Sequence, residues 1–174
     1  IGLARSTNLR QWEFVGDVPL AGIGRAGKPG WVRDRDGGLR LVVTDPGGAH
    51  VVTPDARFEN WQAPQPLQGL AGHADPVVLP DGEGYLAVAR RERDDRLVLL
   101  RSGSLAGPWK TEATLDGLGT SLDAAALVRH GSALRLYGSD AGRRAWFVDS
   151  SDGGRTWGER RRLTGTAAMA PGFG

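Results

Sequence analysis

Four tryptophans recur along the chain at nearly constant spacing. Trp12, Trp61, Trp109 and Trp157 are separated by 49, 48 and 48 residues. Each of them ends a stretch that is rich in turn-forming residues such as Ser, Asn, Asp and Gly. Chance placement of the six tryptophans in the chain does not produce such regularity. The sequence therefore predicts a repeated unit of about 48 residues.

Each repeat consists of short apolar runs that end at turn residues. One repeat has such runs at 77–79, 85–89 and 97–100, with Asp81-Gly82 between the first two. Runs of roughly five residues that are rich in Val, Leu and Tyr and end at Asp-Gly are typical of antiparallel strands joined by hairpins. No segment has the spacing of an amphipathic helix, and 27 glycines disfavour helices. We therefore predict an all-β chain.

The size of the repeat predicts the architecture. Four antiparallel strands within about 45 to 50 residues make a blade of a β-propeller. The chain then holds about three and a half blades, because propellers place one such unit after another around an axis. The predicted units are a partial blade at 1–20, full blades at 21–66, 67–115 and 116–164, and the start of a further blade at 165–174.

An arc of this size leaves sheet edges and apolar faces open. Three explanations remain: a tight four-bladed closure, completion by self-association or by a partner, and a piece of a larger propeller. The third is favoured, because propellers usually close with about four to eight blades. The chain opens with Ile1 and shows no leader pattern, so we expect a processed product or an excised piece.

Composition excludes several classes of function. The chain has no cysteine, which rules out disulfides, thiolate zinc sites and cysteine nucleophiles. Its three histidines lack metal-ligand spacing, and its Gly-rich stretches lack the context of a phosphate loop, so we expect neither metal nor cofactor. Its 22 basic and 20 acidic residues are interspersed, which argues against nucleic acid. No run approaches the roughly 18 apolar residues of a membrane helix, so we expect a soluble protein, secreted or cytoplasmic.

A complete motif stands near the end of the last full unit. Residues Ser150–Trp157 read Ser-Ser-Asp-Gly-Gly-Arg-Thr-Trp and match S-x-D-x-G-x-T-W at every fixed position. The segment resembles the Asp-box of sialidases and other propellers, a structural element of the outer rim. We expect Ser150 and Asp152 to cap the hairpin turn. We expect Gly154 to take a positive φ and Trp157 to pack between strands.

A second resemblance starts at Asp75. The stretch 75–86, followed by Ser102 and by Gly-Pro-Trp at 107–109, is similar to a blade of the five-bladed arabinanases, xylosidases and fructosidases. Residues 1–12 resemble an outer strand and the following turn of the same glycoside hydrolases. The resemblance implies a five-bladed propeller that acts on carbohydrate. It also implies catalytic carboxylates at the starts of the innermost strands, facing a central funnel.

Two aspartates fit that implication and are the predicted catalytic residues. Asp75 matches the Asp-Pro that opens an inner strand, where the resemblance implies a residue that orients the general acid. Asp123 stands 48 residues later, at the start of the next inner strand. Equivalent points of adjacent blades would both face the funnel. Glycoside cleavage needs such a pair, because a protonated acid must reach the leaving oxygen while an ionised carboxylate activates water.

We predict that His73 and Trp31 bind substrate. His73 lies two residues before Asp75, where it could contact a sugar hydroxyl; the alternative is an imidazole satisfied by local polar groups. Trp31 stands close to an inner-strand start, where its ring could stack on a sugar, and core packing is its alternative. The arginines within 90–93 could hold an anionic sugar, but their acidic neighbours favour a self-neutralising hairpin.

The sequence departs from the glycoside hydrolase pattern at other inner-strand starts. Lys28 or Gly30 stands at that point in the first full blade, and Ala170 stands there in the last unit. None of the six glutamates maps to an inner-strand start, so the general acid usual in that group is not found. Three functions therefore stay open. They are hydrolysis or binding of a glycoside in the funnel, a non-catalytic platform for glycans or proteins, and a sialidase-like hydrolase.

Overall fold

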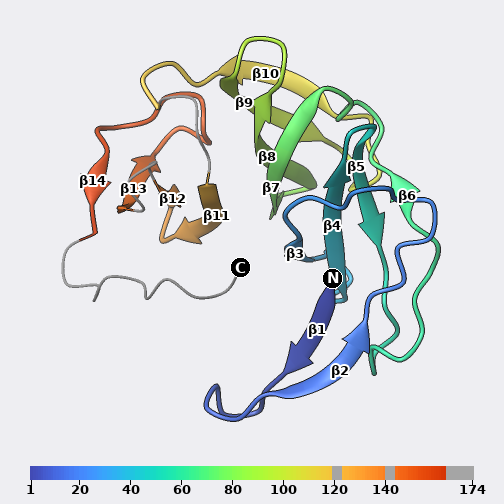
Figure 1. Ribbon diagram of the computed structural model, residues 1–174. Helices are drawn as coiled ribbons and strands as arrows, with labels where there is room; N and C mark the ends of the chain where they lie inside the picture. Colours follow the sequence, from blue (N-terminus) through green and yellow to red (C-terminus); the bar gives the residue numbers. More distant parts are fainter. Residues whose placement is uncertain (119–122, 140–143, 164–174) are drawn as a thin grey trace.

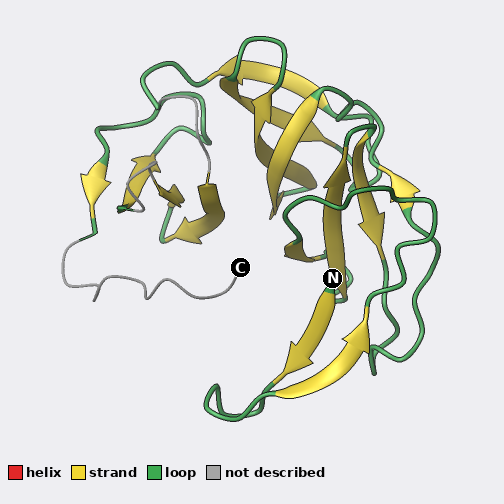
Figure 2. Cartoon of the chain, viewed as in Figure 1, coloured by secondary structure: helices red, strands yellow, loops and turns green. Residues whose placement is uncertain are grey.

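The described part of the chain is built from strands and turns. The computed structural model describes residues 1–118, 123–139 and 144–163, with only the backbone described for 123–125. These residues form fourteen strands in four antiparallel sheets (Figure 1). No helix occurs among them (Figure 2), so none of the residues described forms a helix long enough to cross a membrane. The all-β prediction is confirmed.

The first sheet has two strands and the second has four. The two-stranded sheet consists of β1 (Gly2–Arg5) and β2 (Glu13–Asp17). In the second sheet each strand pairs with the next along the chain. Its strands are β3 (Gly30–Arg33), β4 (Leu39–Asp45), β5 (Gly48–Val52) and β6 (Gln65–Pro66).

Two further sheets repeat this four-stranded order. The third sheet contains β7 (His73–Asp81), β8 (Gly84–Arg91), β9 (Arg96–Ser102) and β10 (Lys110–Thr114). The fourth contains β11 (Asp123–His130), β12 (Ala133–Ser139), β13 (Ala145–Ser150) and β14 (Arg161–Arg162).

The sheets follow one another around a centre, as the blades of a propeller do. Figure 1 shows β3, β7 and β11 nearest the centre and β6, β10 and β14 at the outer rim. The inner strand β7 contacts both β3 and β11. The predicted β-propeller of antiparallel blades is therefore confirmed. The exact blade boundaries stay predictions, and the unit predicted at 165–174 lies outside the described residues.

The hydrophobic core lies between successive sheets. One cluster joins Val42 of the second sheet to Ala87 of the third, and another joins Leu86 of the third to Leu136 of the fourth. Because side chains alternate across a strand, the neighbours Leu86 and Ala87 point to opposite faces. The third sheet is therefore covered on both faces.

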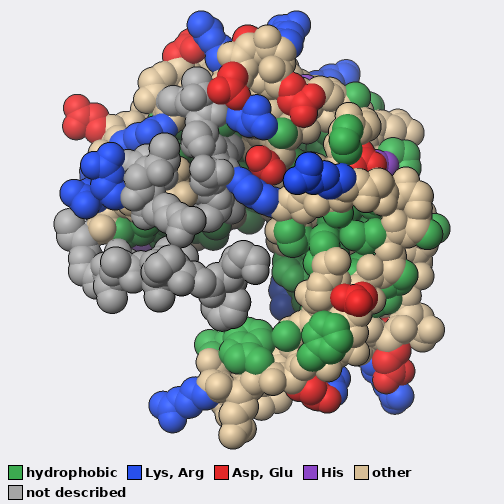
Figure 3. Space-filling view, viewed as in Figure 1, with side chains coloured by type: hydrophobic (Ala, Val, Ile, Leu, Met, Phe, Trp, Pro, Cys, Tyr) green, Lys and Arg blue, Asp and Glu red, His purple; other side chains and the backbone are tan. Residues whose placement is uncertain are grey.

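The arm formed by β1 and β2 is covered less completely. Val18 and Leu3 pack against Leu41 of the second sheet, in a third cluster. Two aromatic residues of the arm remain largely exposed, with Trp12 at 61% and Phe14 at 66%. Figure 3 shows hydrophobic side chains gathered on this arm.

Charged hairpins also link neighbouring sheets. The Arg35 guanidinium, in the β3–β4 hairpin, donates to the Glu83 carbonyl of the β7–β8 hairpin at 2.5 Å. On the other side, Arg129 of β11 binds the Asp81 carboxylate of the same β7–β8 hairpin. Arg101 also binds Asp81, with 2.5 Å between Nη1 and Oδ2. The β7–β8 hairpin is thus fixed to the sheet before it and to the sheet after it.

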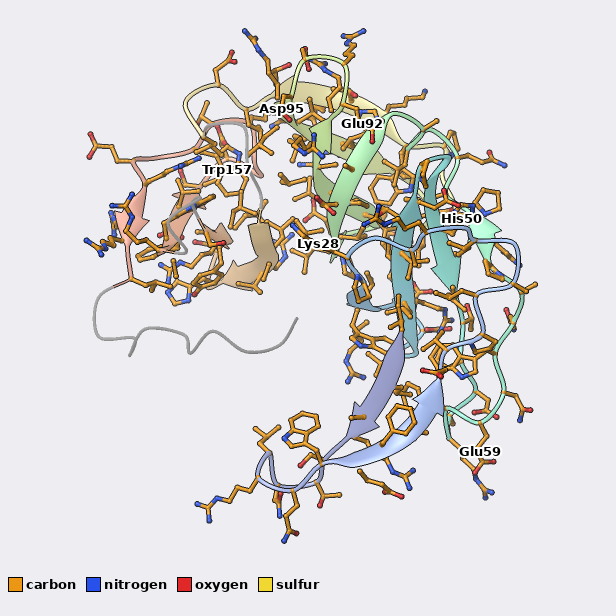
Figure 4. All side chains as sticks on the ribbon, in the orientation of Figure 1. Lys28, His50, Glu59, Glu92, Asp95 and Trp157 are labelled. Atoms are coloured by element: carbon orange, nitrogen blue, oxygen red, sulfur yellow. The ribbon has the colours of Figure 1, made fainter. Side chains whose placement is uncertain are left out.

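The turn between β13 and β14 is held by its own side chains. The Gly154 N–H donates to Ser150 Oγ at 2.8 Å, and the Thr156 N–H donates to Asp152 Oδ1 at 2.9 Å. The hydrogen bond from the Thr156 hydroxyl lowers the pKa of the Asp152 carboxyl well below its usual range. Gly154 has a φ of 92°, and the partly buried Trp157 packs on the core between the third and fourth sheets (Figure 4).

Candidate functional site

Asp75 lies at an irregular point near the start of the innermost strand β7. Its φ is 51°, in the left-handed region that residues with side chains rarely adopt. The pairing of β7 with β8 shifts between Ala74 and Val77, which leaves Asp75 and Pro76 in a β-bulge. Such a φ costs about 1–3 kcal/mol, and both strain and bulges are frequent at functional positions, where they redirect a side chain.

The Asp75 carboxylate faces a lysine from the neighbouring sheet. Lys28, in the segment before β3, places its Nζ 3.8 Å from Asp75 Oδ2. The Lys28 side chain is half exposed and that of Asp75 is 22% exposed, so solvent reaches both charges. Figure 4 shows Lys28 toward the centre of the arc, between the inner strands. An ion pair therefore spans two neighbouring inner-strand starts.

Asp123 begins β11, but its register differs from that of Asp75. Asp75 lies six residues before Asp81, the last paired residue of β7, whereas Asp123 lies seven before His130, the last paired residue of β11. The register of β11 shifts between Asp123 and Ala126, so Asp123 precedes the irregularity that contains Asp75 in β7. The expectation that both aspartates hold the same blade position is wrong by one residue. Their catalytic roles stay predictions.

His73 opens β7 opposite Arg91 of β8. Its Nδ1 lies 3.1 Å from the Ala71 carbonyl oxygen, which can only accept, so Nδ1 carries a proton. Its Nε2 is buried and has no hydrogen-bond partner among the described residues. His73 lines a cavity of about 650 Å³, whose other lining residues are Ala71, Gly72, Arg91, Glu92, Arg93 and Thr111.

Trp31 belongs to a separate aromatic cluster. Its ring centre lies 5.8 Å from that of Phe58 and 6.3 Å from that of Trp61, both in the connection between β5 and β6. Its neighbour Val32 points to the opposite face of β3, into the core shared with the third sheet. Trp31 is 43% exposed, and its predicted contact with a sugar stays a prediction.

The hairpin between β8 and β9 neutralises most of its own charges. Arg90 pairs with Asp95 at 2.8 Å and Arg91 pairs with Asp94 at 2.6 Å. The Arg91 guanidinium, through its hydrogen bond, lowers the pKa of the Asp94 carboxyl. Within the described ranges, Arg93 forms no ion pair. Its side chain stands beside the cavity with its charge uncompensated by direct contact.

The sequence alone did not connect Glu92 and Thr111, two further polar residues of this cavity, with His73. The available signal was antiparallel pairing, which places the start of β7 beside the end of β8 and the hairpin that follows. Thr111 comes from β10, and no sequence pattern connects it to His73.

Solved structures of glycoside hydrolases share this fold. An exo-β-1,3-galactanase from Clostridium thermocellum is 16% identical, with a TM-score of 0.69, over 92% of this chain and 42% of its own. An exo-β-1,3-galactanase from Phanerochaete chrysosporium, solved with β-1,3-galactotriose, is 13% identical, with a TM-score of 0.63, over 92% and 42%. A Bacillus subtilis arabinanase is 16% identical, with a TM-score of 0.57, over 85% and 62%.

These similarities extend over most of this chain but over only part of the solved proteins. The chain spans less than half the length of the two galactanases and 62% of the arabinanase. No family model and no curated protein matches the sequence. At these levels of identity the likeness concerns the fold, and it agrees with the resemblance drawn from the residues around Asp75. The chain has the β-propeller fold of these glycoside hydrolases.

Proposed function

We propose that the chain is part of a carbohydrate-active propeller that hydrolyses glycosidic bonds at its inner-strand starts. The observation that carries the proposal is the position of Asp75. Its backbone is strained within a bulge of β7, and its Oδ2 lies 3.8 Å from Nζ of Lys28, which precedes the inner strand of the neighbouring sheet. Backbone strain and β-bulges are both frequent at functional positions, and Asp75 combines the two in an inner strand. The fold likeness to galactanases and an arabinanase supports a glycoside as the substrate.

In this proposal the two carboxylates belong to Asp75 and Asp123. One protonates the leaving oxygen and the other activates water, as glycoside hydrolysis requires. The acid and the base need different environments. Asp75 lies within the register shift of β7 and Asp123 lies before that of β11, so their environments differ. Before substrate binds, the Lys28 ammonium compensates the charge of Asp75.

A second candidate is a propeller that binds glycans without cleaving them. Lys28 stands at the inner-strand start of the second sheet, where the glycoside hydrolase pattern has an acid. The described inner strands β3, β7 and β11 contain no glutamate. A funnel with these residues keeps hydrogen-bonding groups for a sugar but lacks a glutamate to act as general acid.

Hydrolysis of aryl glycosides tests the first candidate. With aryl β-galactosides, α-arabinosides and β-xylosides, Asp75→Asn and Asp123→Asn are each expected to lower kcat by roughly 100-fold or more. Asp95→Asn, in the exposed β8–β9 hairpin, is the matched control and keeps full activity. Urea unfolding of each variant separates lost chemistry from lost fold.

The wild type itself decides between the candidates. A protein that binds β-1,3-galactotriose in calorimetry but releases no sugar from any of these substrates contradicts hydrolysis and supports the glycan-binding platform. A protein that neither binds nor cleaves them overturns both.

A further inference from the structure

The cavity beside His73 lies next to the candidate site but is not part of the Asp75–Lys28 pair. His73 stands two residues before Asp75 on β7, so the cavity and the carboxylate share one end of the strand. Its volume of about 650 Å³ falls in the range of small-molecule sites, about 300–1,000 Å³. A ligand unit held there would lie close to a glycan that enters the funnel.

The lining offers both hydrogen-bond donors and acceptors. Arg91 and Arg93 donate, Glu92 accepts, and the Thr111 hydroxyl does either. Nδ1 of His73 lies 3.1 Å from the Ala71 carbonyl oxygen, and Nε2 is buried, so neither ring nitrogen is available to a ligand and the polar contacts come from the other side chains.

We propose that this cavity is a subsite for a neutral, hydroxyl-rich sugar unit of the glycan, an inference that rests on the proposed function. Sugar hydroxyls donate to Glu92, and sugar oxygens accept from Arg93 and from the Thr111 hydroxyl. Among the described residues no Trp, Tyr or Phe lines the cavity, so the subsite works mainly through hydrogen bonds.

The charges in the cavity favour a neutral sugar over an acidic one. The Arg91 guanidinium already donates two hydrogen bonds to the Asp94 carboxylate, at 2.6 and 2.9 Å. Arg93 and Glu92 then contribute one positive and one negative charge to the lining. A uronate would meet repulsion from Glu92 as well as attraction to Arg93, whereas hydroxyl groups satisfy both.

Calorimetry with defined trisaccharides tests the subsite. The probes are β-1,3-galactotriose and α-1,5-arabinotriose, with trigalacturonate as the charged comparison. Arg93→Ala and Glu92→Gln are each expected to raise the Kd of a neutral trisaccharide roughly 5- to 10-fold, the effect of losing one hydrogen bond. Arg90→Ala, which removes a guanidinium of the same hairpin outside the cavity, is the matched control with unchanged Kd.

The possible results separate the subsite from the proposed hydrolysis. If Arg93→Ala and Glu92→Gln weaken binding while no substrate is cleaved, the subsite stands and the hydrolytic proposal fails. If aryl glycosides are cleaved through Asp75 but both variants bind trisaccharides like the wild type, the subsite is overturned. Tighter binding of trigalacturonate than of either neutral probe, or no binding of a neutral probe, also overturns it.

Discussion

The β1–β2 arm and the third sheet use similar residues but bury them very differently. In the third sheet Leu86, Leu97 and Leu99 have no exposed surface. On the arm Trp12 and Phe14 keep 61% and 66% of theirs, although both are larger and apolar. The apolar character of Trp12 and Phe14 therefore does not by itself determine their burial.

The difference comes from the number of neighbouring sheets. The third sheet packs against the second through one face and against the fourth through the other. The arm has two strands and contributes Leu3 and Val18 to a single cluster. A propeller blade therefore gains its stability from adjacent blades, because apolar area is removed from water only where two sheets meet.

Removing one large apolar side chain from each region gives the largest expected contrast. Leu86→Ala is expected to lower the free energy of unfolding by about 2–5 kcal/mol, because it leaves a cavity between two sheets. Trp12→Ala is expected to cost about 0.5 kcal/mol or less, as an exposed position does. Urea denaturation measures both.

An equal loss for the two variants would show that the arm is covered in solution. Light scattering then distinguishes self-association, which the open edges predict, from a compact monomer.

Ion pairs provide a second, smaller contrast. Arg101 binds the carboxylates of Asp81 and Glu112 and donates to the Gly153 carbonyl of the fourth sheet at 2.6 Å. Arg101→Ala is expected to cost about 1–2 kcal/mol, because several partners lose their donor at once. Arg5→Ala, which removes an exposed pair with Glu13 on the arm, is expected to leave the urea midpoint unchanged. A larger loss for Arg5→Ala would reverse the ranking of the two regions.

The smallest contrast is the pH dependence of two turns. Asp152 has a lowered pKa because it accepts hydrogen bonds from Thr156, so its stabilisation is present above the ordinary value of 3.8 and is lost as the pH falls through the lowered one. Asp152→Asn is therefore expected to reduce Tm at pH 7 and to match the wild type more closely as the pH drops below 3.8. Calorimetric scans from pH 7 to roughly pH 2 follow the closing gap.

The turn of the arm is the control, because an amide replaces the carboxylate there. Asn8 Oδ1 accepts from the N–H groups of Arg10 and Gln11 at 2.9 Å. Asn8→Ala is expected to reduce Tm by the same amount at every pH. A constant gap for Asp152→Asn as well would contradict the assignment of an ionised carboxylate to the turn.

Much of the fold could be predicted from turn chemistry. Gly82 has a φ of 57° and closes the first hairpin of the third sheet, where the Asp81-Gly82 pair predicts a turn. The lengths of the outer strands could not be predicted. The outer strand β14 has only two residues, because pairing of β13 with its neighbour is limited to Arg161 and Arg162.

The candidate site was less predictable, because it depends on single-residue shifts. A spacing of 48 places Asp75 and Asp123 at the same point of a repeat, but the ends of β7 and β11, at Asp81 and His130, lie 49 residues apart, so Asp123 corresponds to Ala74. The cavity at His73 depends on contacts among three separate segments, which a single sequence does not reveal.

The short outer strands also affect how the protein resists aggregation. β6 and β14 have two residues each, Pro66 has no N–H to offer, and β14 carries two arginines. Brief, charged or proline-bearing edges are poor templates for the backbone of another molecule. Among the described strands, β1 has an unpaired side of four residues and exposed aromatic residues nearby. The third outer strand, β10, is longer, with five residues, and carries Lys110 and Glu112. Fibril-like pairing between copies is therefore directed away from β6 and β14 and toward β1.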